Sequence, residues 1–179
     1  MNFVKIFRFC ARAIIGITER LKRIVFSGPL YIRIYPSGTM CNHRCIMCDI
    51  HNDSDDEAFL LSLDREKLSI DDYHLLIKKM PLSVVNLEIV GGGEPLLMKN
   101  IAQIFLAVRK KNIGGSLITN GSLLSEELSK TLVESRWNSI RISFNGATKE
   151  TYCKIHRVDH FDLVLNNIRK LQRLRGKHR

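Results

Sequence analysis

The chain has 179 residues, of which 45% are hydrophobic, and it carries a formal net charge of +10. This length and composition are those of one globular domain with a sizeable core. No aromatic-rich basic groove accompanies the positive charge, so we expect no nucleic-acid partner.

Five cysteines are present, and three of them lie close together in the sequence. Such clustering is typical of a metal site rather than of a disulfide framework, and no secretory signal is evident. We therefore expect a reducing environment and a cytoplasmic protein.

Apolar residues recur at three- and four-residue spacing within the first 25 residues, with basic residues between them. This pattern predicts a basic amphipathic helix over residues 1–28. Arg8 and Arg12 interrupt the apolar runs, which excludes a membrane span of about 20 residues and argues against a secretory signal peptide. The helix either covers one end of the core or contacts an anionic membrane surface through residues 3–25.

Short apolar runs rich in β-branched residues alternate with helical patterns across residues 29–179. The alternation predicts a parallel α/β sheet within one core domain. The expected strands are residues 30–35, 84–90, 116–119 and 139–144.

The helices between these strands have recognisable starts. Ser69 is expected to cap the first helix, with Asp72 as its partner in a capping box. Asn100 should begin the second helix, Ser125 should cap the third, and residues 114–115 predict a turn before the third strand. The expected buried residues are Tyr73, Leu76, Ile77 and Met80 on the first helix, and Leu163, Leu165, Ile168, Leu171 and Leu174 on a final helix.

Each expected strand ends in a loop with glycine or polar side chains. These loops hold the clustered cysteines, residues 92–94, residues 120–121 and residues 145–146. The carboxyl ends of parallel strands lie along one edge of the sheet, where ligands bind in this class of fold. The sequence therefore predicts that four loops converge on one site.

Cys41, Cys45 and Cys48 follow the first expected strand with the spacing C-x3-C-x2-C. Three thiolates on one loop form a metal site that lacks one protein ligand. A structural zinc site normally closes with four ligands, whereas a four-iron cluster held by three cysteines leaves one iron open to a small molecule. His51 could complete a Cys3His zinc site, so a zinc-binding module stays open as an alternative.

An open iron would bind a chelating small molecule, such as an amino acid headgroup with one nitrogen and one oxygen. Glu94 could hold the ammonium group, and Gly92 and Gly93 would let the backbone approach closely. Ser143 and Asn145 offer hydroxyl and amide groups that suit a ribose or a carboxylate.

These motifs together resemble those of radical S-adenosylmethionine (SAM) enzymes over residues 30–175. The resemblance rests on the cysteine motif, on the Gly-Gly-Glu-Pro segment at residues 92–95 and on residues 143–148. Residues 150–171 are similar to the branch that often carries a C-terminal SPASM-type domain with further clusters.

The resemblance implies a partial (β/α) barrel and a 4Fe–4S cluster at Cys41, Cys45 and Cys48, with SAM chelating the fourth iron. The reduced cluster would cleave SAM to methionine and a 5'-deoxyadenosyl radical, which abstracts hydrogen from a small-molecule or peptide substrate. A reductant such as flavodoxin or ferredoxin would supply the electron.

The resemblance also implies roles for individual residues. Residues 92–94 would bind the methionine amino group of SAM, and Ser143 and Asn145 would lie along its carboxylate or ribose. Arg157 is a further candidate for the carboxylate. Met47 stands where the family often has an aromatic residue, which would alter the contact with the adenine.

About four strand–helix units fit into the chain, so we expect an incomplete (β/α) partial TIM barrel that is truncated before the fifth and sixth strands. The fourth strand would then be an exposed edge. A catalytically inactive fragment or a regulatory half-barrel is therefore the main alternative to an active enzyme.

The histidines show no pattern that marks them as metal ligands. His43 lies inside the cysteine motif, where it could tune a cluster or be solvated. The sequence assigns no role to His74, His156, His160 or His178.

Overall fold

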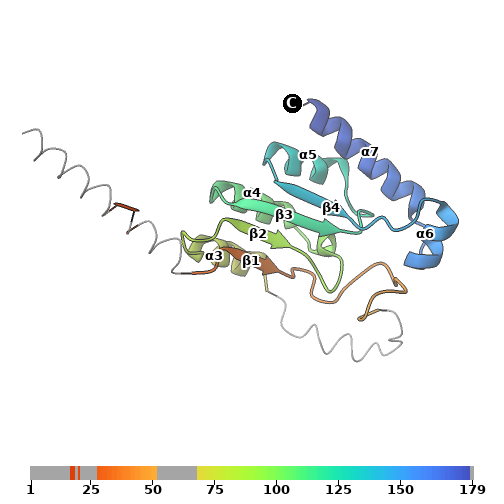
Figure 1. Ribbon diagram of the computed structural model, residues 1–179, viewed down its shortest axis with the longest axis horizontal. Coiled ribbons are helices and arrows are strands. Elements are labelled where there is room, and N and C mark those ends of the chain that lie inside the picture. Colours follow the sequence, from red (N-terminus) through yellow and green to blue (C-terminus); the bar gives the residue numbers. More distant parts are fainter. Residues whose placement is uncertain (1–16, 19, 21–27, 52–67, 178–179) are drawn as a thin grey trace, which may run out of the picture.

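The computed structural model describes residues 17–18, 20, 28–51 and 68–177 (Figure 1). In this part of the chain, parallel strands form a four-stranded sheet in the order β1-β2-β3-β4. The predicted parallel α/β class is confirmed. The strands are β1 (Tyr31–Ile34), β2 (Asn86–Ile89), β3 (Gly114–Thr119) and β4 (Ser139–Ile142).

Helices follow the strands along the chain and cover one face of the sheet (Figure 1). Helix α3 contacts α4, α4 contacts α5, and α5 contacts α7, so these helices form a continuous layer. The described helices are α3 (Ile70–Lys79), the short 3-10 helix η1 (Pro95–Leu97), α4 (Ile101–Lys110), α5 (Glu126–Glu134), α6 (Lys149–His156) and α7 (Phe161–Lys177).

The spatial order of the strands equals their order in the chain. Crossovers between parallel strands are right-handed, so successive steps in one direction place all the connecting helices on the same face. A doubly wound sheet would instead reverse its strand order and carry helices on both faces. The observed arrangement is that of a segment of a (β/α) barrel wall.

The core lies between the sheet and the helix layer. Ile34, Ile89 and Leu117 are paired in register across three strands, and each is at most 7% exposed. Ile104 and Phe105 of α4 belong to the same core cluster and are fully buried. Each such side chain contributes about 1.5–3 kcal/mol relative to an exposed one.

The opposite face of the sheet is polar. Glu88 on β2 accepts hydrogen bonds from Arg33 on β1 at 2.7 Å and from Arg141 on β4 at 2.6 Å. The two arginine side chains are 57% and 63% exposed. Ion pairs of this exposure contribute little to stability. Because two arginines share one carboxylate, the group leaves a net positive charge on the open face.

The predicted helix starts are confirmed in two cases. Ser69 and Asp72 form the capping box, with Asp72 N–H donating to Ser69 Oγ and Ser69 N–H donating to Asp72 Oδ2. Ser125 Oγ accepts from Leu128 N–H. Asn100 does precede α4, but it is left-handed with φ 62° and its side chain makes no cap hydrogen bond.

Several predictions of detail are wrong. Residues 114–115 belong to β3 rather than to a turn, because Gly114 pairs with Asn86 and Gly115 with Leu87 of β2. Gly115 lies against the Trp137 ring, where a larger residue would collide. Leu76 is 37% exposed and Leu163 is 45% exposed. The single final helix predicted is preceded by α6. Helix α7 buries Leu171 as predicted, but its other buried residues are Val164 and Asn167.

Parts of the predicted N-terminal region lie outside the described residues. Only Ile17, Thr18 and Arg20 of the expected helix at residues 1–28 are described as helical. Residues 52–67, which lie between β1 and α3 in the sequence, are outside the described part as well. Among the helices that can be described, none is long and apolar enough to cross a membrane.

Replacing Gly115 by alanine should destabilise the sheet. The added Cβ would lie 2.7–2.9 Å from three atoms of the Trp137 ring, which itself packs edge-on against Phe105. We expect the free energy of unfolding in urea to fall by about 1–3 kcal/mol, as for other overpacked cores. Gly176→Ala is the matched control, since nothing lies within 4 Å of its added Cβ. Equal stability of the two variants would contradict the packing described here.

Candidate metal and cofactor site

A cavity of about 180 Å³ opens at the carboxyl edge of the sheet. The loops after all four strands contribute to it, which confirms the prediction that four loops converge on one site. Its lining includes the three clustered cysteines, residues 91–95 after β2, residues 118–120 at the end of β3, Ser143 after β4, and His43, His51 and His156.

The cysteine loop is fixed against the loop after β2 by backbone contacts. Gly93 N–H donates to the Gly38 carbonyl at 3.0 Å, and Glu94 N–H donates to the Met40 carbonyl at 2.7 Å. A Cβ at Gly93 would lie 1.9 Å from the Met40 carbonyl oxygen. Only glycine permits this contact, so residue 93 holds the cysteine loop at the site.

Side-chain amides join the cysteine loop to the end of β3. Asn120 Nδ2 donates to Asn42 Oδ1, and Asn42 Nδ2 donates to Ser122 Oγ, both at 2.8 Å. Asn167 of α7 supports the same loop, because its Nδ2 donates to the Gly121 carbonyl at 2.9 Å. The buried Asn167 amide therefore links helix α7 to the loop after β3.

Helix α6 holds the cysteine loop from the other side. Arg44 N–H donates to the His156 carbonyl at 3.3 Å, and Ile46 N–H donates to the Ile155 carbonyl at 2.9 Å. The last carbonyls of a helix have no partner within it. Here the two residues that flank Cys45 satisfy them.

Glu94 is 2% exposed, and both oxygens of its carboxylate accept hydrogen bonds. Oε1 accepts from Thr119 Oγ1 at 2.5 Å and from Leu96 N–H at 3.1 Å, while Oε2 accepts from Asn120 N–H at 2.7 Å. Burial raises the pKa of Glu94, and these hydrogen bonds oppose the rise. The carboxylate thus joins the end of β2 to the end of β3.

The three cysteine thiols are partly buried around one cavity. Burial raises the pKa of Cys45 to about 11, with Cys41 and Cys48 adding to the rise, and burial also raises the pKa of Cys41. Neighbouring thiolates in such a site repel each other. A bound metal cation offsets this repulsion and lowers the pKa of the thiols that coordinate it. The donor set therefore fits a metal centre.

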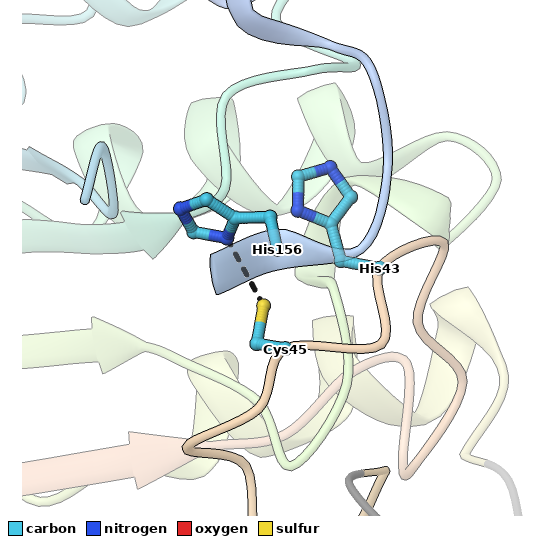
Figure 2. A group of neighbouring side chains, drawn as sticks. All are labelled: His43, Cys45 and His156. Carbon is cyan, nitrogen blue, oxygen red and sulfur yellow. Dashed lines mark hydrogen bonds between the residues drawn. The ribbon is translucent and has the colours of Figure 1, made fainter. Parts of the chain in front are cut away.

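His43, from within the cysteine motif, and His156, to which the sequence assigns no role, lie beside Cys45 (Figure 2). His156 Nδ1 is 3.0 Å from Cys45 Sγ, and His43 Nε2 is 3.0 Å from His160 Nδ1. His43 and His156 are each 1% exposed, so of the two alternatives for His43, solvation is excluded. Burial lowers the pKa of both rings, to about 4 for His43.

These histidine contacts have no local sequence signal. Cys45 and His156 are 111 residues apart, and His43 and His160 are 117 apart. The first pair meets because α6 docks on the cysteine loop, and the second because the segment between α6 and α7, which holds His160, follows it there. His51, the fourth ligand of the zinc alternative, has Nδ1 3.3 Å from Cys48 Sγ and Nε2 2.7 Å from the Thr39 carbonyl oxygen.

Of the remaining candidate residues, Ser143 is part of the cavity lining, whereas Asn145, Arg157 and Met47 are not among the lining residues. Ser143 lines the cavity and is exposed. Asn145 is exposed, and its backbone N–H donates to His156 Nε2 at 3.3 Å. Arg157 is the left-handed C-cap of α6, with φ 53°, and is exposed. Met47 is 52% exposed.

Comparison with known proteins shows the family of this chain. The sequence profile of the Radical SAM superfamily matches residues 35–178. The chain belongs to the radical SAM superfamily. The family's cofactors are a 4Fe–4S cluster and SAM, and the three-cysteine donor set described above fits them.

Curated relatives from archaea share this core. The chain is 34% identical over 131 residues to a probable GTP 3',8-cyclase of Methanothermobacter thermautotrophicus, covering 72% of this chain and 39% of the relative. It is 25% identical over 131 residues to the protein of the same name in Methanocaldococcus jannaschii, covering 73% and 41%. The chain thus spans about two fifths of the length of these relatives.

Solved structures share the fold. The SAM-bound structure of Streptococcus suis SuiB superimposes with a TM-score of 0.67 at 19% identity, covering 94% of this chain and 37% of SuiB. The structure of anSMEcpe with bound SAM also gives a TM-score of 0.67, at 23% identity, covering 82% and 40%. These matches confirm the incomplete (β/α) barrel predicted from the sequence.

Glu94→Gln should destabilise the protein before any cofactor is added. Glutamine keeps one oxygen, which can still accept from Thr119 and Leu96 at the position of Oε1, but its NH2 group would then face the Asn120 N–H at the position of Oε2. A buried donor without an acceptor costs about 1–3 kcal/mol. We expect that loss in urea unfolding of the apoprotein. The control Glu127→Gln, on the exposed first turn of α5, should change stability by no more than about 0.5 kcal/mol.

Proposed function

We propose that the chain is the core of a radical SAM enzyme in which Cys41, Cys45 and Cys48 hold the 4Fe–4S cluster. The single observation that carries this proposal is the position of the cysteine motif, on a cavity shared with residues 92–94 and the end of β4. When bound, the cluster and SAM supply reductive cleavage to a 5'-deoxyadenosyl radical for hydrogen abstraction.

The polypeptide binds and orients SAM in this proposal. Residues 92–94 receive the methionine amino group, and backbone carbonyls are the acceptors we expect, because the Glu94 carboxylate already accepts three hydrogen bonds. Ser143 and Asn145 lie along the carboxylate or ribose, and Arg157 is a further partner for the carboxylate. A reductant such as flavodoxin or ferredoxin delivers the electron.

Anaerobic reconstitution with iron and sulfide tests the metal site. We expect a broad brown absorbance that bleaches with dithionite, and about four irons per chain. Cys45→Ala should lose this absorbance, whereas Cys153→Ala should keep it, since Cys153 lies on α6 with its thiol directed to Asp159. A colourless protein with one bound zinc would instead support the Cys3His alternative with His51.

Release of 5'-deoxyadenosine tests the reaction itself. The reconstituted chain with SAM and dithionite should produce it, and Cys45→Ala should reduce production to background. A chain that carries a full cluster but releases no 5'-deoxyadenosine would favour the inactive fragment or regulatory half-barrel.

The class of substrate is a second part of the proposal. The curated relatives are named for GTP, and one SuiB structure holds a precursor peptide. Arg33 and Arg141 give the open face of the sheet two exposed guanidinium groups. Both groups pair with Glu88, but the three side chains together still carry a net positive charge. This net charge favours an anionic substrate such as a nucleotide, because guanidinium groups bind phosphates in bidentate fashion.

Substitution of these arginines tests the nucleotide proposal. Arg33→Gln and Arg141→Gln should each weaken GTP binding about tenfold or more, as expected for loss of a charge-assisted hydrogen bond. Isothermal titration at fixed ionic strength measures the affinity. Arg169→Gln, on α7 and away from the cavity lining, is the control. Unchanged GTP affinity in both variants would remove the support for a nucleotide and leave the peptide class.

A further inference from the structure

The neighbours of the two ring nitrogens of His156 determine which nitrogen carries the proton. Asn145 backbone N–H, which can only donate, lies 3.3 Å from Nε2. Nε2 is therefore an acceptor, and a neutral ring must carry its proton on Nδ1. Nδ1 is the nitrogen that lies 3.0 Å from Cys45 Sγ (Figure 2). The ring thus presents an N–H donor to the cysteine sulfur.

The ring cannot easily turn away from this sulfur. It is 1% exposed, with the Tyr152 ring centroid 4.3 Å from its own and the His43 centroid 5.3 Å away. The backbone on either side of Cys45 is also fixed, because Arg44 N–H and Ile46 N–H bind the last carbonyls of α6. Cys45 and His156 are therefore held in one rigid unit.

We propose that His156 is a positioning residue that donates Nδ1–H to Cys45 Sγ in the cluster-loaded protein and thereby raises the cluster's reduction potential. The physical reason is that reduction adds negative charge to the cluster and its sulfurs. A hydrogen-bond donor at a ligand sulfur stabilises the reduced state more than the oxidised one. This inference rests on the proposed function, since it requires Cys45 to ligate the cluster.

The same ring joins the cluster ligand to the loop after β4. Its Nε2 accepts from Asn145, which is one of the residues proposed to lie along SAM. His156 therefore has two separable contacts, one through each nitrogen. Substitutions can remove them one at a time.

Three variants at residue 156 separate these contacts. His156→Asn places an amide N–H near the position of Nδ1 and keeps the donor to Cys45. His156→Gln places its amide near the position of Nε2 and keeps an acceptor for Asn145. His156→Phe fills the space and keeps neither.

A redox titration monitored by electron paramagnetic resonance measures the potential of each reconstituted protein. We expect a more negative potential for His156→Phe and His156→Gln than for the parent, and a potential close to the parent for His156→Asn. His74→Phe on α3, away from the cavity lining, should leave the potential unchanged. Equal potentials in the parent and His156→Phe, both carrying a full cluster, would overturn the inference.

Nitrogen-15 NMR of the histidines in the parent apoprotein tests the geometry without any cluster. We expect His156 to be the Nδ1–H tautomer, and an Nε2–H tautomer would overturn the inference even if no variant folded. The proposed function fails separately, through zinc uptake or the absence of an iron–sulfur spectrum in the parent. The two failures are therefore distinguishable.

Discussion

At the centre of the site, two stretches of backbone meet so closely that no side chain fits between them. A Cβ on Gly93 would collide with the Met40 carbonyl oxygen, and the same oxygen accepts Glu94 N–H. This contact places the cysteine loop against the end of β2. The Glu94 carboxylate then binds Thr119 and Asn120 and fixes the end of β3. The glycine–glutamate pair therefore positions three of the four loops around the cavity.

The fourth side of the site depends on helix α6. Its terminal carbonyls accept the N–H groups of the residues on either side of Cys45, and His156 turns back onto the cysteine sulfur. The cysteines are consequently held between a loop contact and a helix end, both built from backbone hydrogen bonds. Such a frame keeps three thiols together even though burial and mutual repulsion oppose their ionisation.

The consecutive strand order explains why the chemistry lies where it does. All the crossover helices cover one face and bury the apolar side chains, which leaves the other face with the Arg33, Glu88 and Arg141 ion pairs. The site lies at the carboxyl edge, where the polar loops of every strand can reach one point. Family membership, the cluster and SAM agree with this geometry.

The sequence by itself determined the alternation of strands and helices, the capping box at Ser69, and the cysteine and glycine motifs that carry the family resemblance. These features are local, because periodicity, caps and ligand spacing act over a few residues. Only the tertiary structure decided which side chains surround the cysteines. Cys45 and His156 are 111 positions apart, and no local pattern predicts their contact. Gly115 is likewise a strand residue because it pairs with Leu87 of β2, and it must be glycine because the Trp137 ring lies against it.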